Sequence, residues 1–113
     1  MKNIQKLLDK NQLSAVELFK DKVSQEYDIA NIIVYGSTTQ RKTEEGSDLD
    51  ILVVTKKMLA HRDRHEIQNI ATKINWHYDT NISATIVDEY NWEQGLYSLM
   101  LIKDEVLRNG VSV

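Results

Sequence analysis

The chain has 113 residues, a formal net charge of −3, and neither cysteine nor proline. This length suits one domain over residues 1–113, because domains commonly have roughly 100–150 residues. The lack of cysteine excludes disulfide frameworks, thiol nucleophiles and thiolate zinc sites. We expect a cytoplasmic protein, since the N-terminus lacks a secretory signal and no apolar run is long enough to span a membrane. The acidic balance argues against direct nucleic-acid binding.

The first predicted element is an amphipathic helix. Apolar residues recur at steps of three and four from Leu13 to Val23, which places them on one helical face. Ser14 and Glu17 fit a capping box at its beginning, and a start nearer Ile4 stays open.

Three segments predict strands. Ile29–Tyr35 and Leu49–Thr55 are short apolar runs rich in β-branched residues, which are typical of buried strands. The polar segment between them, 37–47, is expected to hold a turn. Asn81–Val87 alternates between apolar and polar residues, which predicts a half-buried strand. The inner face of that strand is expected to contain Ile82, Ala84 and Ile86.

Two further helices complete the predicted elements. The apolar spacing is helical from Lys57 to about His77 and again from Tyr90 to Leu107. Asn109-Gly110 is a helix stop, and the tail Val111–Val113 suits a last short strand. The packing face of the last helix is expected to contain Trp92, Leu96, Leu99, Met100 and Val106. This order of elements predicts an α/β (α+β) fold, with a small mixed β-sheet packed by helices.

The residues that carry chemistry lie where one predicted strand ends and the next begins. The first strand leads into Gly36 and Ser37, and ten residues later come Asp48 and Asp50. Residues two apart in a strand point to the same face, so both carboxylates project together. A divalent cation between them would offset their repulsion, and oxygen-only ligands suit Mg²⁺. Gly36 lets a phosphate approach the backbone, and Ser37 offers a hydroxyl group.

The pattern Gly36-Ser37, ten residues, Asp48-Leu49-Asp50 resembles the signature of the minimal nucleotidyltransferases (MNT) of the DNA polymerase β superfamily, and the likeness covers nearly the whole chain. The resemblance implies the nucleotidyltransferase fold. It also implies that Gly36 and Ser37 hold ATP or another nucleoside triphosphate, while Asp48 and Asp50 bind the catalytic metals. The implied reaction moves a nucleoside monophosphate to an acceptor hydroxyl and releases pyrophosphate.

Two positions depart from the family's pattern. The third carboxylate of active members aligns with Ser83, and Asp79 lies on the same side by strand parity but four residues too early. Gln40 stands where relatives often have arginine, so Arg41 with Lys42 is the candidate for phosphate-facing charge, with solvated loop charges as the equal alternative. Loss of the third carboxylate is expected to weaken binding of the second metal and to remove the positioned base, so both an active and an inactive protein are compatible with the sequence.

The tail Ile102-Lys103-Asp104-Glu105, followed by Asn109-Gly110-Val111, resembles the MNT half of two-protein modules. The resemblance implies a helical HEPN-domain partner, often a ribonuclease toxin, for which the MNT protein is the antitoxin; some such antitoxins transfer AMP to a tyrosine. Two functions follow. One is transfer of a nucleoside monophosphate to a protein or small-molecule acceptor. The other is a catalytically weak or inactive antitoxin that binds its partner. A homo-oligomer is compatible with both.

Other residues suggest weaker alternatives. His61 and His65 share a helical face at the spacing of a two-histidine metal pair, although a solvated face is the favoured interpretation. Aminoglycoside nucleotidyltransfer is disfavoured, because the chain has no room for a second domain that shapes a drug site. Five aromatic residues could stack on a base, with core or partner contacts favoured instead. They are Trp76, Tyr78, Tyr90, Trp92 and Tyr97.

Overall fold

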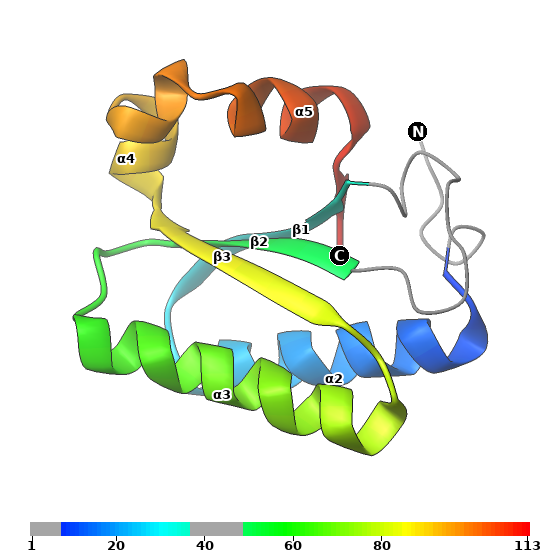
Figure 1. Ribbon diagram of the computed structural model, residues 1–113. Helices are drawn as coiled ribbons and strands as arrows, with labels where there is room; N and C mark the ends of the chain where they lie inside the picture. Colours follow the sequence, from blue (N-terminus) through cyan, green and yellow to red (C-terminus); the bar gives the residue numbers. More distant parts are fainter. Residues whose placement is uncertain (1–7, 37–48) are drawn as a thin grey trace.

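The computed structural model describes residues 8–36 and 49–113. The elements are, in chain order, α2 (Lys10–Glu26), β1 (Ile29–Tyr35), β2 (Leu49–Thr55), α3 (His61–Tyr78), β3 (Ile82–Asp88), α4 (Glu89–Glu93), the 3-10 helix η1 (Leu96–Leu99), α5 (Leu101–Asn109) and β4 (Val111–Ser112). The strands form a sheet in the order β3-β2-β1-β4 (Figure 1). β1 is antiparallel to β2 and β4, whereas β2 and β3 are parallel. The predicted mixed sheet is confirmed.

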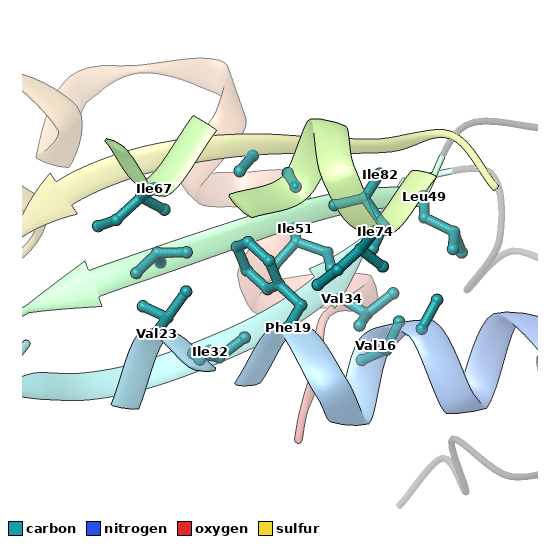
Figure 2. Packing of buried hydrophobic residues seen from close by; sticks show 14 of the residues in the cluster. Val16, Phe19, Val23, Ile32, Val34, Leu49, Ile51, Ile67, Ile74 and Ile82 are labelled. Carbon is teal, nitrogen blue, oxygen red and sulfur yellow. The ribbon is translucent and has the colours of Figure 1, made fainter. Parts of the chain in front are cut away.

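Helices α2 and α3 cover one face of this sheet (Figure 1). Phe19 of α2 and Ile67 of α3 are fully buried, and they pack with Ile51 of β2 and other strand residues in one apolar cluster (Figure 2). Burying each such side chain contributes roughly 1.5–3 kcal/mol. The alternation predicted for β3 is confirmed as well, since the cluster also contains Ile82, Ala84 and Ile86.

The starts of both long helices differ from the predicted ones. Asp9 caps α2: its carboxylate accepts the Gln12 backbone N–H at 2.7 Å, and the Gln12 side chain accepts the Asp9 N–H at 3.1 Å. The predicted capping box of Ser14 and Glu17 is wrong, because both residues lie inside α2; Ile4 lies outside the described residues. Helix α3 begins at His61, after a turn in which the Thr55 hydroxyl donates to the Lys57 carbonyl at 2.6 Å.

The opposite face of the sheet is covered by α4, η1 and α5 (Figure 1). A second apolar cluster forms there, in which Trp92 of α4 and Val106 of α5 pack with Tyr35 and Leu52 of the strands. In the described parts of the chain, the helices are too short or too polar to cross a membrane.

The prediction of one continuous helix from Tyr90 to Leu107 is wrong. The helix stops after Glu93, the Gly95 N–H bonds the Tyr90 carbonyl at 3.0 Å, and Met100 is extended with φ −90° and ψ 151°. Trp92 and Val106 are buried as expected. The other three residues of the predicted packing face point outward, with exposed fractions of 72% for Leu96, 90% for Leu99 and 43% for Met100.

Side chains of α3 form hydrogen bonds along the outer edge of the sheet, where β3 has no further strand beside it in the described structure. Three α3 side chains donate hydrogen bonds to alternate β3 carbonyls. The pairs are Arg64 with Ile86 at 3.4 Å, Gln68 with Ala84 at 2.7 Å, and Asn75 with Ile82 at 3.0 Å. Because open edges recruit strands from other chains, these bonds protect the edge from pairing.

Candidate functional site

Three side chains lie side by side across the sheet, near one end of the strands. Tyr35 of β1 pairs with Asp50 of β2, and Asp50 pairs with Ser83 of β3. Paired residues share a face of the sheet. Leu49 and Ile51, the neighbours of Asp50, are fully buried against α2 and α3, so the row lies on the opposite face. The site is thus a half-buried carboxylate between a buried phenol and an exposed hydroxyl.

Gly36 brings the chain that leaves β1 directly against Asp50. Its φ of +86° belongs to the left-handed region, which glycine adopts without steric cost. A Cβ at position 36 would lie 2.3 Å from Oδ2 of Asp50 and 3.2 Å from its carboxyl carbon. Any side chain here would therefore displace the carboxylate. The two halves of the sequence motif, Gly36 and Asp50, meet in the folded chain.

Three of the predicted site residues cannot be placed. Ser37, Arg41 and Asp48 lie outside the described residues. Gly36 and Asp50 are the members of the predicted set that the structure describes.

Ser83, the position at which the family resemblance implies the third carboxylate, is the β3 residue next to Asp50, and it carries no carboxylate. Asp79 is not part of β3; it is the exposed C-cap of α3, with a left-handed φ of 55° and ψ of 48°. The parity argument for Asp79 is therefore wrong, because this turn interrupts the strand alternation. Within residues 8–36 and 49–113, no group of three or more His, Asp or Glu side chains is arranged to hold a metal ion.

Sequence reasoning did not single out Tyr35, whose side chain is 8% exposed. Burial raises the pKa of its phenol, a hydrogen bond with Thr85 opposes this, and the charges of Asp50 and Glu105 raise the pKa further. The phenol is therefore uncharged at neutral pH, with Glu105 of α5 in electrostatic range. Strand parity with Asp50 could have identified Tyr35. No local signal identifies Glu105, because the packing of α5 on β1 positions it.

A cavity lies at the other end of β2 and β3. This cavity of about 300 Å³ is lined by residues that include Thr55, Arg64 and Asp88. The Asp88 carboxylate accepts hydrogen bonds from the Asn91 N–H at 3.1 Å and from the Asn91 side chain at 2.6 Å. Desolvation raises the pKa of Asp88, but the Asn91 bonds and the positive charge of Arg64 outweigh it, and the pKa is lowered. Asp88 thus caps α4 in its ionised form.

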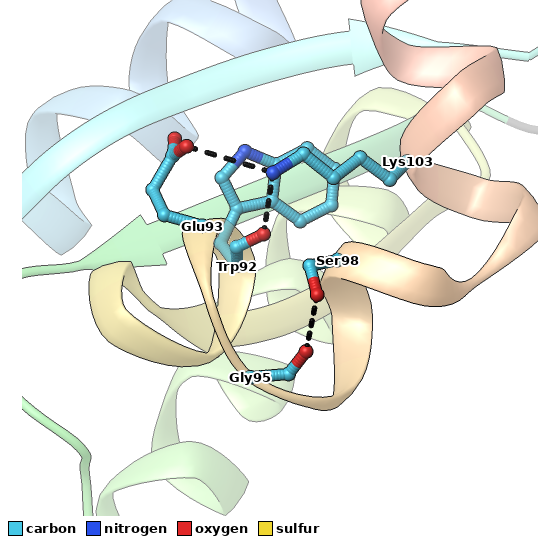
Figure 3. A network of polar contacts seen from close by, with 5 residues as sticks. All are labelled: Trp92, Glu93, Gly95, Ser98 and Lys103. Atoms are coloured by element: carbon cyan, nitrogen blue, oxygen red, sulfur yellow. Dashed lines mark hydrogen bonds and ion pairs between the residues drawn. The ribbon is translucent and has the colours of Figure 1, made fainter.

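The two histidines and the two tryptophans lie in different surroundings. His61 and His65 are exposed, with ring centroids 6.4 Å apart, which agrees with a solvated helix face. Trp92 is a core residue, and the Lys103 Nζ lies 5.2 Å above its ring (Figure 3). Trp76 is 91% exposed on α3, on the far side of the sheet from Asp50.

The fold is a mixed sheet in which the Gly36 turn packs against the Asp50 carboxylate. The family model described as "Polymerase beta, Nucleotidyltransferase" matches residues 17–112. The chain belongs to this family.

A curated relative has a more specific name. The chain is 31% identical over 86 residues to "Putative protein adenylyltransferase MJ1305" of Methanocaldococcus jannaschii. The match covers 72% of this chain and 58% of the relative, so the chain spans little more than half of that protein.

Solved structures share the fold. A toxin–antitoxin structure with AMP-PNP has a TM-score of 0.59 and 22% identity, over 93% of this chain and 72% of that one. An MNT antitoxin in complex with a tri-AMPylated HEPN toxin of Shewanella oneidensis has a TM-score of 0.53 and 21% identity, over 90% and 70% of the two chains. At these identities the likeness shows the fold alone.

Proposed function

We propose that this protein binds ATP or another nucleoside triphosphate with Mg²⁺ and transfers the nucleoside monophosphate to an acceptor hydroxyl. The acceptor is a protein, with a HEPN-domain toxin as the first candidate, or a small molecule. The observation that carries the proposal is the packing of Gly36 on Asp50, which joins a glycine-lined backbone to a carboxylate. A phosphate can approach such a backbone closely, and a carboxylate is a ligand suited to Mg²⁺.

The chain's own residues have distinct parts in this proposal. Asp50, with Asp48, supplies carboxylate oxygens; Gly36 and Ser37 hold the triphosphate, and Arg41 balances its charge. Bound Mg²⁺ would stabilise negative charge on the phosphates during the displacement. The acceptor oxygen bonds to the α-phosphorus, the bond from that phosphorus to the β-phosphate oxygen breaks, and pyrophosphate leaves. The hydroxyl proton passes to a base or to water.

The similar proteins support both the nucleotide and the acceptor. The relative from Methanocaldococcus jannaschii is named as a protein adenylyltransferase, one structural neighbour was crystallised with AMP-PNP, and another is an antitoxin with an AMPylated HEPN toxin. By analogy, the nucleotide proposed here is ATP and the acceptor is a side-chain hydroxyl of a HEPN-domain protein.

Ser83 favours a second candidate function. It lies beside Asp50 and supplies no negative charge to a second cation. A protein with an incomplete metal site can retain nucleotide or partner binding while losing transfer. In that case the chain inhibits a HEPN-domain partner by binding alone.

Mass spectrometry of a HEPN-domain protein from the same organism distinguishes these functions. The protein is mixed with this chain, ATP and Mg²⁺, and its mass is compared before and after incubation. Transfer adds one or more AMP groups, and Asp50→Asn abolishes the addition. Ser83→Asp is expected to increase the rate, because it places a third carboxylate one strand spacing, about 4.8 Å, from Asp50.

The outcomes distinguish the two functions. An AMP adduct formed by the natural chain establishes transfer. An unmodified but inhibited partner supports the binding-only antitoxin, most clearly if Ser83→Asp then produces an adduct. A partner that is neither modified nor inhibited would contradict both.

A further inference from the structure

The side chain of Tyr35 lies across the middle of the sheet. Tyr35 belongs to β1, and its phenol shares a hydrogen bond with the side chain of Thr85 on β3. Strand β2 lies between β1 and β3 (Figure 1). Neighbouring strands are about 4.8 Å apart, so the phenol spans two strand spacings, or about 10 Å with the Thr85 side chain included. It reaches that far only by passing over β2.

The phenol ring crosses β2 between two side chains. Tyr35 is level with Asp50, its partner on β2, whereas Thr85 is level with Leu52. Asp50 and Leu52 are two residues apart, so both point to the face of the sheet that holds Tyr35. A path from Tyr35 to Thr85 therefore passes between them. The ring has the Asp50 carboxylate on one side and Leu52 on the other.

Packing fixes the ring in this position. Tyr35 is 8% exposed, and it belongs to the apolar cluster that also contains the fully buried Leu52 and Val106 of α5. Side chains in a close-packed interior occupy one rotamer, because a turn of the ring would collide with its neighbours. The strands and α5 together determine where the ring lies.

The Asp50 carboxylate is enclosed from two directions. The backbone of Gly36 lies so close that a Cβ there would be 2.3 Å from Oδ2 of Asp50. The Tyr35 ring occupies the space toward Leu52. Besides burial, the charge of Asp50 raises the pKa of the Tyr35 phenol, which agrees with this proximity. A carboxylate that is already held in one orientation loses less conformational entropy when it binds a ligand.

We propose that Tyr35 is a positioning residue of the candidate site: its ring holds the Asp50 carboxylate against the Gly36 backbone, ready to bind Mg²⁺. This inference rests on the proposed function, because the cation is the one that accompanies ATP there. The ring carries this role, since the hydroxyl group extends beyond Asp50 to Thr85. Residues that orient a metal ligand typically contribute about 10–100-fold to metal affinity.

Titration of Mg²⁺ at a fixed concentration of ATP tests the proposal. Calorimetry gives the Mg²⁺ concentration at which ATP binding is half complete. Tyr35→Leu and Tyr35→Met remove the ring but keep an apolar side chain in the cluster, and each is expected to raise this concentration about tenfold. Tyr35→Phe restores the ring without the hydroxyl group and is expected to need no more Mg²⁺ than the natural chain. ATP affinity in EDTA is expected to be equal in all of these proteins.

Two controls show that the effect passes through Asp50. Tyr78→Leu removes a half-buried ring that packs on the opposite face of the sheet, and its Mg²⁺ requirement is expected to be that of the natural chain. In a chain that already carries Asp50→Asn, Tyr35→Leu is expected to change nothing further, because both substitutions affect one carboxylate. Thermal melting confirms that every variant is folded.

The outcomes separate this inference from the proposed function. If Tyr35→Leu and Tyr35→Met need no more Mg²⁺ than Tyr35→Phe, the proposal is wrong and the proposed function stands. Equal weakening of ATP binding with Mg²⁺ and with EDTA would show that the ring only stabilises the fold, which also overturns it. A loss in Tyr35→Phe as large as in Tyr35→Leu would assign the role to the hydroxyl group instead. ATP binding by the natural chain that does not depend on Mg²⁺ would contradict the proposed function and this inference together.

Discussion

At the scale of single residues, the candidate site depends on one backbone conformation. The positive φ of Gly36 allows the Asp50 carboxylate to lie where a Cβ would otherwise be. The sequence predicted that Gly36 and Asp50 belong to one motif, because a strand ends at one and a second strand begins near the other. It did not predict their direct contact, which depends on the antiparallel register of β1 and β2.

The residues flanking Asp50 differ in how predictable they were. Ser83 was singled out because the family resemblance implies a carboxylate at its position, and the parallel register of β2 and β3 places it next to Asp50. The pKa of Tyr35 depends on long-range packing, because Thr85, Glu105 and Tyr97, which act on its phenol, belong to three other elements. A sequence pattern specifies the strand but not these neighbours.

Tyr27, the C-cap of α2, is expected to make the stability sensitive to high pH. Burial raises the pKa of its phenol to about 12, and a hydrogen bond to Glu66 and the charge of that carboxylate contribute. Below pH 10 both the folded and unfolded states are protonated, and the contribution to stability is complete. Between pH 10 and about 12 the unfolded state ionises first, so stability falls as pH rises.

Tyr27→Phe removes this ionisation and is expected to lessen the fall in melting temperature over that range of pH. Melting curves at several values of pH, with phenolate absorbance recorded in parallel, measure the effect. Tyr90→Phe, which changes a 67%-exposed tyrosine, is the control. If the melting temperature falls equally with pH in Tyr27→Phe and in the natural chain, Tyr27 does not cause the loss of stability.

At the scale of elements, the strands were the best predicted part of the fold. Runs such as Ile29–Tyr35 and Leu49–Thr55 are buried and β-branched, so local preference and burial agree. The segment after β3 was predicted poorly. The spacing of Leu96, Leu99 and Met100 imitates a buried helical face, but the chain turns at Gly95 and these side chains point to solvent.

The junction between α3 and β3 depends on one asparagine. Asn75 donates to the Ile82 carbonyl at 3.0 Å, and its side-chain oxygen accepts the Ile82 N–H at 2.7 Å and the Thr80 hydroxyl at 3.1 Å. Asn75→Ala leaves these groups without a partner, and an unsatisfied buried polar group costs about 1–3 kcal/mol. We expect a loss of about 2 kcal/mol in the free energy of unfolding, measured by urea denaturation.

Asn69→Ala is the control for this experiment, since it changes an exposed asparagine of the same helix. Its effect is expected to lie within about 0.5 kcal/mol. If Asn75→Ala has the same free energy of unfolding as Asn69→Ala, the Asn75 side chain does not support the junction.

At the scale of the whole molecule, the two faces of the sheet differ in character. The face under α2 and α3 is a closed apolar core (Figure 2). The other face holds the smaller cluster, and Asp50 with Gly36 lies near one end of the strands; the cavity lies at the other end of β2 and β3. The larger apolar core therefore lies on one face of the sheet, and the candidate site lies on the other.

The most direct test of the proposed function is a calorimetric titration of ATP into the protein, with Mg²⁺ and with EDTA. The natural chain is expected to bind ATP at least about tenfold more tightly with Mg²⁺, which corresponds to about 1.4 kcal/mol. Asp50→Asn is expected to abolish that difference, because Mg²⁺ is bound through carboxylates and asparagine has no charge. Asp104→Asn, a change at an exposed carboxylate of α5, is expected to behave as the natural chain does. ATP binding that is independent of Mg²⁺, or equal in Asp50→Asn, would contradict the account.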